Sequence, residues 1–227
     1  MNAVPKVRRF RKPWLLSGLS VLVVLVAMLV WSPWSSGEKR VAIPDKVCQK
    51  SLSSKYVGPL LPVSGEEFKE VPITTGFALP VKPYVHGGGG SCDLSAGGQG
   101  ISIEHNLFLD GYADKKIKEA SNSPGSRGIR FGDAKGYVGQ FERDSKYLKS
   151  ASHVTSASLY LACPKPGIHD SKYVLNVTVV ASGSRADATT RQNVVSLISE
   201  ATRIVARDLL GCKGADNLPN GSAKVER

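Results

Sequence analysis

An apolar run near the start of the chain limits most strongly what this sequence can fold into. Residues Trp14 to Trp31 read WLLSGLSVLVVLVAMLVW, interrupted only by two serines and one glycine. At about 1.5 Å of rise per residue, a helix of this length reaches roughly 27 Å, close to the thickness of a bilayer's hydrocarbon core. Exposing so many leucines and valines to water is unfavourable, so the run predicts one transmembrane helix over residues 13–34.

The charges on either side of the run predict its orientation. Basic side chains tend to remain on the cytoplasmic side of a membrane. Five of them precede the run, with no acidic residue among them: Lys6, Arg8, Arg9, Arg11 and Lys12. Residues 1–12 are therefore expected to form a cytoplasmic tail, and the chain from residue 35 onward is expected to lie outside the cell membrane.

The tryptophans favour a retained anchor over a cleaved secretory signal. Trp14, Trp31 and Trp34 are the only tryptophans in the chain, and all flank the run, where their amphipathic rings suit the two membrane interfaces. A secretory signal also has a basic start and an apolar centre, but this run is long and no A-x-A cleavage pattern follows it. Cys48 lies too far from the run to be a lipidated cysteine.

Charge argues against nucleic acid as a partner. The whole chain has a net charge of +11, but five of its 30 basic residues and none of its 19 acidic ones precede the apolar run. The rest of the chain thus carries only about +6, and its basic residues alternate with acidic ones in segments such as KEASN and FERDSK. Nucleic-acid binding requires a concentrated basic stripe with aromatic partners. A weak attraction to anionic lipid or wall polymer remains open.

The four cysteines all follow the apolar run, and we expect them to form two disulfides. They are Cys48, Cys92, Cys163 and Cys212. An even number outside the cytoplasm is typical of disulfide bonding, whereas a zinc site would favour close pairs such as C-x-x-C. Four cysteines allow three pairings, and we favour Cys48–Cys92 with Cys163–Cys212.

Hydrophobic periodicity predicts helices at the two ends of the outer region and strands between them. Residues 43–59 have helical spacing and end at a Gly-Pro pair, while residues 194–209 carry a clear apolar stripe with Gly211 as a cap. Alternation predicts strands in ISIEHNLFL, KGYVGQFER, ASLYLACP and KYVLNVTVVAS, the last two as an antiparallel hairpin, and a short helix in DGYADKKIKEA. The glycines at 128 and 132 indicate loops.

These elements underlie both the pairing and the fold class. Cys163 ends a predicted strand and Cys212 follows the last helix, so their disulfide would join helix to sheet. Cys92 lies in a glycine-rich region that a bond to the first helix would hold. We expect an α+β fold, an antiparallel sheet with helices packed on one face. Residues 35–43 would be a tether, 44–213 the extracytoplasmic domain and 214–227 a polar tail.

Sequence motifs indicate no reaction. The chain has no G-x-S-x-G, H-E-x-x-H or S-x-x-K motif and no Gly-Lys pair for a phosphate-binding loop. His105 lies on the apolar side of a predicted strand, which is typical of a core histidine. His86 and His169 fall in predicted loops and His153 in a polar stretch. We therefore predict no catalytic residue, no metal site and no cofactor.

Three short motifs give the outer region a family resemblance. VCQKSL, GSCDLS and LLGC occur at its beginning, middle and end, over roughly residues 44–213. This layout resembles the small extracytoplasmic domains of high-GC Gram-positive actinobacteria, many of which are lipoproteins or single-pass proteins. The resemblance implies an envelope domain without assigned catalytic residues. The chain departs from many of these proteins in having an anchor helix in place of a lipidated cysteine.

We therefore expect a single-pass protein of the cell membrane whose outer domain binds another envelope component. Its partners would be the lipid bilayer and either an envelope protein or a wall polymer. One alternative is a hydrolase or transferase acting on the cell wall, using residues around His86–Cys92 or near His169. Another is a structural subunit of a membrane complex, in which the apolar helix itself makes the contacts.

Overall fold

The computed structural model describes residues 40–72, 77, 89–109, 111–143, 152–164 and 173–226. The chain divides into two units, Met1–Lys39 and Arg40–Arg227, and all described residues belong to the second. The predicted tail, the transmembrane helix and its flanking tryptophans therefore lie outside the described residues. Within these ranges, no helix is long and apolar enough to cross a membrane.

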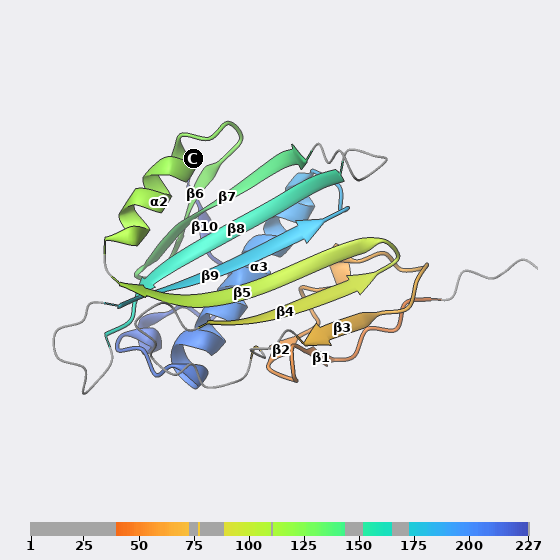
Figure 1. The fold of residues 1–227 in the computed structure, drawn as a ribbon, viewed down its shortest axis with the longest axis horizontal. Helices are drawn as coiled ribbons and strands as arrows, with labels where there is room; N and C mark the ends of the chain where they lie inside the picture. Colours follow the sequence, from red (N-terminus) through yellow and green to blue (C-terminus); the bar gives the residue numbers. More distant parts are fainter. Residues whose placement is uncertain are drawn as a thin grey trace, which may run out of the picture. The chain divides into compact units, whose positions relative to one another are not determined.

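An eight-stranded antiparallel sheet forms the centre of the Arg40–Arg227 unit (Figure 1). Its spatial order is β10-β6-β7-β8-β9-β5-β4-β3. The strands, in that order, are Lys224–Val225, Arg127–Phe131, Ala134–Arg143, Ser152–Ala162, Tyr173–Ser182, Gln99–Leu109, Gly89–Ala96 and Lys69–Pro72. The predicted α+β class and antiparallel sheet are confirmed, including the hairpin of β8 and β9.

Strict alternation along β8 and β9 gives the sheet two chemically different faces. On one face, Leu159 lies opposite Val177, and both side chains are fully buried. On the other, Ser158 lies opposite Thr178, and their hydroxyl groups are hydrogen-bonded at 3.0 Å. Because successive side chains of a strand point to opposite faces, register extends this assignment to neighbouring strands. We call the face of Leu159 and Val177 the α3 face and the face of Ser158 and Thr178 the α2 face.

Helix α3, Ala188–Ile204, covers the α3 face, as its apolar stripe predicts (Figure 1). Leu197 and Ile198 lie in this stripe and are fully buried against the sheet. The helix begins after Asp187, whose carboxylate accepts the backbone N–H of Thr190 at 2.6 Å. It ends in one π turn, η2, at Val205–Leu209, and the chain then turns at Gly211.

Helix α2, Tyr112–Ser121, packs on the opposite face from α3. Its Ala113 and Ile117 form a separate apolar cluster with side chains of the α2 face. Those side chains are Tyr137, Tyr160 and Val174. The short helix was predicted, but the expectation that helices cover only one face is wrong. Because α3 already fills the other face, the narrow apolar stripe of α2 is buried against these two tyrosines and the valine.

The predicted first helix over residues 43–59 does not form. This segment contains the hairpin of β1 (Lys46–Val47) and β2 (Leu52–Ser53), then the 3-10 turn η1 (Gly58–Leu60). Only Val47 and Leu52 of the helically spaced positions are large, apolar and fully buried. Two such residues five positions apart fit a tight hairpin as well as a helix, so the spacing was ambiguous.

The domain extends beyond both predicted boundaries. At its start, the N–H of Val41 donates to the carbonyl of Val63 at 3.0 Å. At its end, the expected polar tail contains the 3-10 turn η3 (Ala215–Asn217), strand β10 and the buried Leu218. The segment expected to be a loop at Gly128 is strand β6. Strands β6 and β10 are short and lack long alternation. They form because β6 pairs with the edge of β7 and β10 pairs in turn with β6.

Candidate functional site

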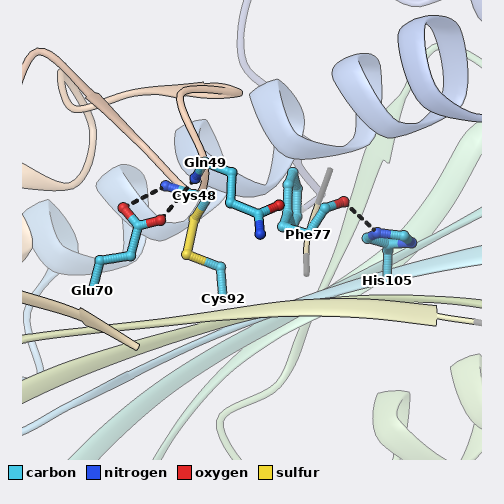
Figure 2. Close-up of a disulfide and its surroundings, with 6 residues drawn as sticks. All are labelled: Cys48, Gln49, Glu70, Phe77, Cys92 and His105. Atoms are coloured by element: carbon cyan, nitrogen blue, oxygen red, sulfur yellow. Dashed lines mark hydrogen bonds between the residues drawn. A yellow bond between two sulfur atoms is a disulfide. The ribbon is translucent and has the colours of Figure 1, made fainter. Parts of the chain in front are cut away.

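The four cysteines form the favoured pairs, Cys48–Cys92 and Cys163–Cys212. Their Cα atoms are 5.5 Å and 4.6 Å apart, respectively, and all four residues are buried. The first bond holds the β1–β2 turn against β4 (Figure 2), and the second joins the end of β8 to the segment after α3. Such buried bonds support a domain that folds in an oxidising, extracytoplasmic compartment. They act on the fold rather than on a ligand.

A carboxylate reinforces the corner held by Cys48–Cys92. Cys48, Gln49 and Lys50 all have left-handed backbones, with φ of 54°, 58° and 65°, a costly conformation for residues other than glycine. The Glu70 carboxylate accepts the N–H groups of Cys48 at 2.9 Å and Gln49 at 2.7 Å (Figure 2). These bonds and the disulfide stabilise the turn, so we assign Glu70 a structural role.

His105 is a core residue, as its strand position predicts. It lies on the α3 face of β5 and is 1% exposed, edge-on to the Phe77 ring at 5.2 Å (Figure 2). Its Nε2 lies 3.1 Å from the Phe77 carbonyl, which accepts the ring N–H. Burial lowers the pKa of His105 from its ordinary value because the charged ring would lose water, an effect that the Phe77 carbonyl partly offsets. A neutral, enclosed imidazole is suited to packing.

The other histidines do not converge on a site in the described ranges. His153 is exposed on β8, while His86 and His169 lie outside the described residues. No group of three His, Cys, Asp or Glu residues is placed to hold a metal ion in the part of the chain that the structure describes. The wall-enzyme alternative, which depends on His86 and His169, stays a prediction.

A cavity of about 640 Å³ lies on the α2 face, where α2 meets strands β6 and β7. Ile117 and Ser121 of α2 form one wall, and Gly128 and Tyr137 lie between this helix and the sheet edge. Glycine at 128 leaves space here, because a Cβ at that position would approach the Glu226 carboxylate to 2.5 Å. We call this cavity the α2 groove.

The α2 groove is basic. Arg130 and Lys135 present their side chains to it, and Glu226 is the one acidic residue among the described residues that line it. Arg127 also borders the cavity, but it lies opposite Val138, so its side chain belongs to the α3 face. Arg130 Nε donates to Glu226 Oε1 at 3.2 Å in an exposed pair. Within the described ranges, Lys135 forms no ion pair. The groove therefore presents one cation without a carboxylate partner and a second that is shared with Glu226.

Strand register brings these charges together. Arg130 of β6 lies opposite Lys135 of β7 on one side and Lys224 of β10 on the other. Like charges directly opposite one another destabilise a sheet. A row of three cations across three neighbouring strands is thus unfavourable for folding. A bound anion would offset the repulsion, so an anion-binding site would explain why the row is present.

Sequence analysis missed this basic cluster. Arg130 and Lys224 are far apart in the chain, and their contact depends on two short strands that had no clear alternation. The available signal was RGIRFGDAKGY, in which basic and apolar residues alternate on either side of a Gly-Asp turn. The mixing of basic and acidic residues along the chain predicted no concentrated basic stripe, whereas strand register places three cations in a row beside the α2 groove.

The fold and the groove define a class of domain: a two-disulfide α+β domain with a basic cavity on the less covered face of its sheet. Comparison with protein-family models, with curated proteins and with solved structures finds no match to this chain. The resemblance to actinobacterial envelope domains consequently stays a prediction.

Proposed function

We propose that this chain is a single-pass, membrane-anchored binding domain of the cell envelope, and that its α2 groove holds an anionic group of an envelope polymer. The observation that carries the proposal is the row of three cations, Lys224, Arg130 and Lys135, beside a cavity of about 640 Å³. Cavities of this size are typical of ligand sites. The two disulfides support an extracytoplasmic location.

The lining residues suit phosphate or carboxylate groups. Arginine offers a planar fork of N–H donors that matches these anions, and lysine offers a mobile point charge. Tyr137 adds an aromatic surface on the same face, against which the ring or carbon chain of a polymer unit can pack. With three cations to one carboxylate, an incoming anion meets a favourable local charge.

The proposed anchor sets where such a ligand would be found. If the apolar run spans the bilayer up to Trp31, residues 32–39 extend at most about 28 Å before the domain begins at Arg40. The domain would then stay close to the extracytoplasmic surface of the cell membrane. The proposed anchor therefore favours, as ligands, polymers that carry phosphate or carboxylate groups near this surface.

A matched pair of double variants tests the proposal. The full-length chain, in nanodiscs of zwitterionic phosphatidylcholine, is titrated with soluble poly(glycerol phosphate) by calorimetry. Lys135→Gln with Lys224→Gln removes two of the three cations in the row and should weaken binding about tenfold or more, since a charge-assisted hydrogen bond contributes about 1.5–3 kcal/mol. Lys115→Gln with Lys118→Gln removes two exposed charges of α2 outside the groove and should change affinity less than twofold.

Two results would contradict the proposal. Equal weakening by both double variants would mean that the polymer responds to overall charge and not to the groove. Absence of binding by the wild-type chain, to this polymer and to a carboxylated one tested alongside it, would remove the anionic ligand altogether.

A further inference from the structure

Glu226 occupies a position in the α2 groove where an anionic ligand would bind. Its Oε1 accepts a hydrogen bond from Arg130 Nε at 3.2 Å, and its Oε2 lies above Gly128. Its backbone N–H donates to the Gly128 carbonyl at 2.8 Å, which fixes the residue directly after β10 beside β6. The chain thus places one of its own carboxylates on a groove arginine.

This ion pair is weak enough to be exchanged. The Arg130 and Glu226 side chains are 55% and 51% exposed, and exposed pairs contribute little to stability. Glu226 is also the one carboxylate among the residues that line the cavity. An anion that enters the groove meets Lys135 without a competing carboxylate, and meets Glu226 only at Arg130.

We propose that Glu226 is a built-in competitor for the phosphate group of the ligand, so that the carboxylate and the phosphate exclude one another at Arg130. This inference rests on the proposed function of the α2 groove. A phosphate has enough oxygen atoms to accept bonds from Arg130 and from its neighbour Lys135 together, whereas the carboxylate satisfies Arg130 alone. Ligand entry therefore moves the Glu226 side chain off Arg130, and the affinity for phosphate is set by this exchange.

Two substitutions remove the competitor in different ways. Glu226→Gln removes its charge and keeps its length. Gly128→Ala keeps the charge but places a Cβ about 2.5 Å from Oε2, so the flexible carboxylate has to move away. Glu119→Gln is the matched control, because it removes one exposed carboxylate that is paired with Lys116 outside the groove.

The readout is the affinity of the full-length chain in nanodiscs for defined phosphate probes. We expect Glu226→Gln to bind poly(glycerol phosphate) about two- to fivefold more tightly, in proportion to the small cost of displacing an exposed pair. Gly128→Ala should shift affinity in the same direction, and Glu119→Gln by less. In an Arg130→Gln background the gain from Glu226→Gln should disappear, because the competition occurs at Arg130.

The source of the phosphate is separated by three probes. These are inorganic phosphate, soluble poly(glycerol phosphate), and nanodiscs that contain phosphatidylglycerol in place of part of the phosphatidylcholine. A gain for Glu226→Gln with any of the three supports the competition, and the probe that shows it names the source.

The failures are distinguishable. If the groove double variant weakens binding but Glu226→Gln does not change it, the competition is wrong and the proposed function stands. If Glu119→Gln raises affinity as much as Glu226→Gln, or if the gain persists without Arg130, the effect is one of net charge and the competition is overturned. If neither wild type nor Glu226→Gln binds any of the three phosphate probes, the competition is overturned, and the proposed function fails with it when the carboxylated polymer is not bound either.

Discussion

The two faces of the sheet differ in composition, and we infer that they differ in role, the α3 face in stability and the α2 face in binding. The α3 face is lined by fully buried side chains such as Leu159 and Val177, and both disulfides attach other segments on this side. The α2 face carries hydroxyl groups, tyrosines and the cations around Arg130. One face thus supplies the burial that stabilises the fold, and the other, freed from that requirement, can carry unfavourable charges for binding. The predictions below test how completely these roles are separated.

The largest expected effect is loss of the disulfide between Cys163 and Cys212. The bond closes a loop of 49 residues in sequence separation, which corresponds to about 4 kcal/mol in the chain-entropy model. The double variant Cys163→Ser with Cys212→Ser should lower the free energy of unfolding by about that amount. Urea unfolding of the full-length chain in detergent micelles, followed by circular dichroism, measures the difference.

The same comparison is made with the wild-type chain under reducing conditions. Reduction opens both disulfides, so the reduced wild type should be less stable than the double variant, which keeps Cys48–Cys92. Wild-type stability in the double variant would contradict this prediction. It would mean that apolar packing alone holds α3 on the sheet, without the covalent link.

Truncation of a core leucine should have the next largest effect, and the two faces should differ. Leu197 of α3 is fully buried, and Leu197→Ala should cost about 3 kcal/mol, within the range for large-to-small changes in a core. Ile117 of α2 is only partly buried, and Ile117→Ala should cost about 1 kcal/mol. Equal costs in urea unfolding would mean that α2 stabilises the fold as much as α3.

Elements with long, regular patterns could be predicted from the sequence. Alternation identified β5, β7, β8 and β9, and the apolar stripe identified α3. The cysteines then followed, because Cys163 ends a strand and Cys212 follows the helix that packs on it. In these segments local preference and tertiary burial favour the same structure.

Elements that depend on distant partners could not be predicted. The β1–β2 hairpin requires Glu70 and Cys92 to hold three left-handed residues, and neither is near it in sequence. Strands β6 and β10 contain two to five residues and gain stability only from pairing with each other and with β7. The candidate site lies on these strands, so its residues could be listed from the sequence but not brought together.

A smaller and pH-dependent effect should come from His105 on the α3 face. Burial lowers its pKa, so the unfolded chain binds a proton more readily than the folded one. Stability from this residue is complete above its ordinary pKa near 6.5 and decreases as the pH falls below that value, by at most about 1.4 kcal/mol per pH unit. Urea unfolding between pH 5 and 8 measures it.

Variants isolate this contribution from that of Glu200. Burial raises the pKa of Glu200, so Glu200 favours the folded state at low pH and opposes His105. His105→Leu should therefore remove the acid-side loss, while His153→Gln, at an exposed position of β8, should keep the wild-type profile. An unchanged profile in His105→Leu would show that the core around Phe77 does not sense pH.

The smallest expected effect on stability belongs to the α2 groove, and it most sharply tests the division between the faces. Lys135 and Lys224 are exposed and form no ion pair within the described ranges, so their side chains contribute little to the folded state. Both lie opposite Arg130, and removal of these like-charge contacts relieves repulsion. Lys135→Gln with Lys224→Gln should thus leave the free energy of unfolding within about 0.5 kcal/mol of wild type, or raise it slightly. Urea unfolding measures this stability and is carried out alongside the binding titration. Unchanged stability with weakened polymer binding would mean that the two charges act in ligand binding and not in folding. A loss of several kcal/mol would show instead that the fold itself depends on them, and the weakened binding could then no longer be attributed to a site.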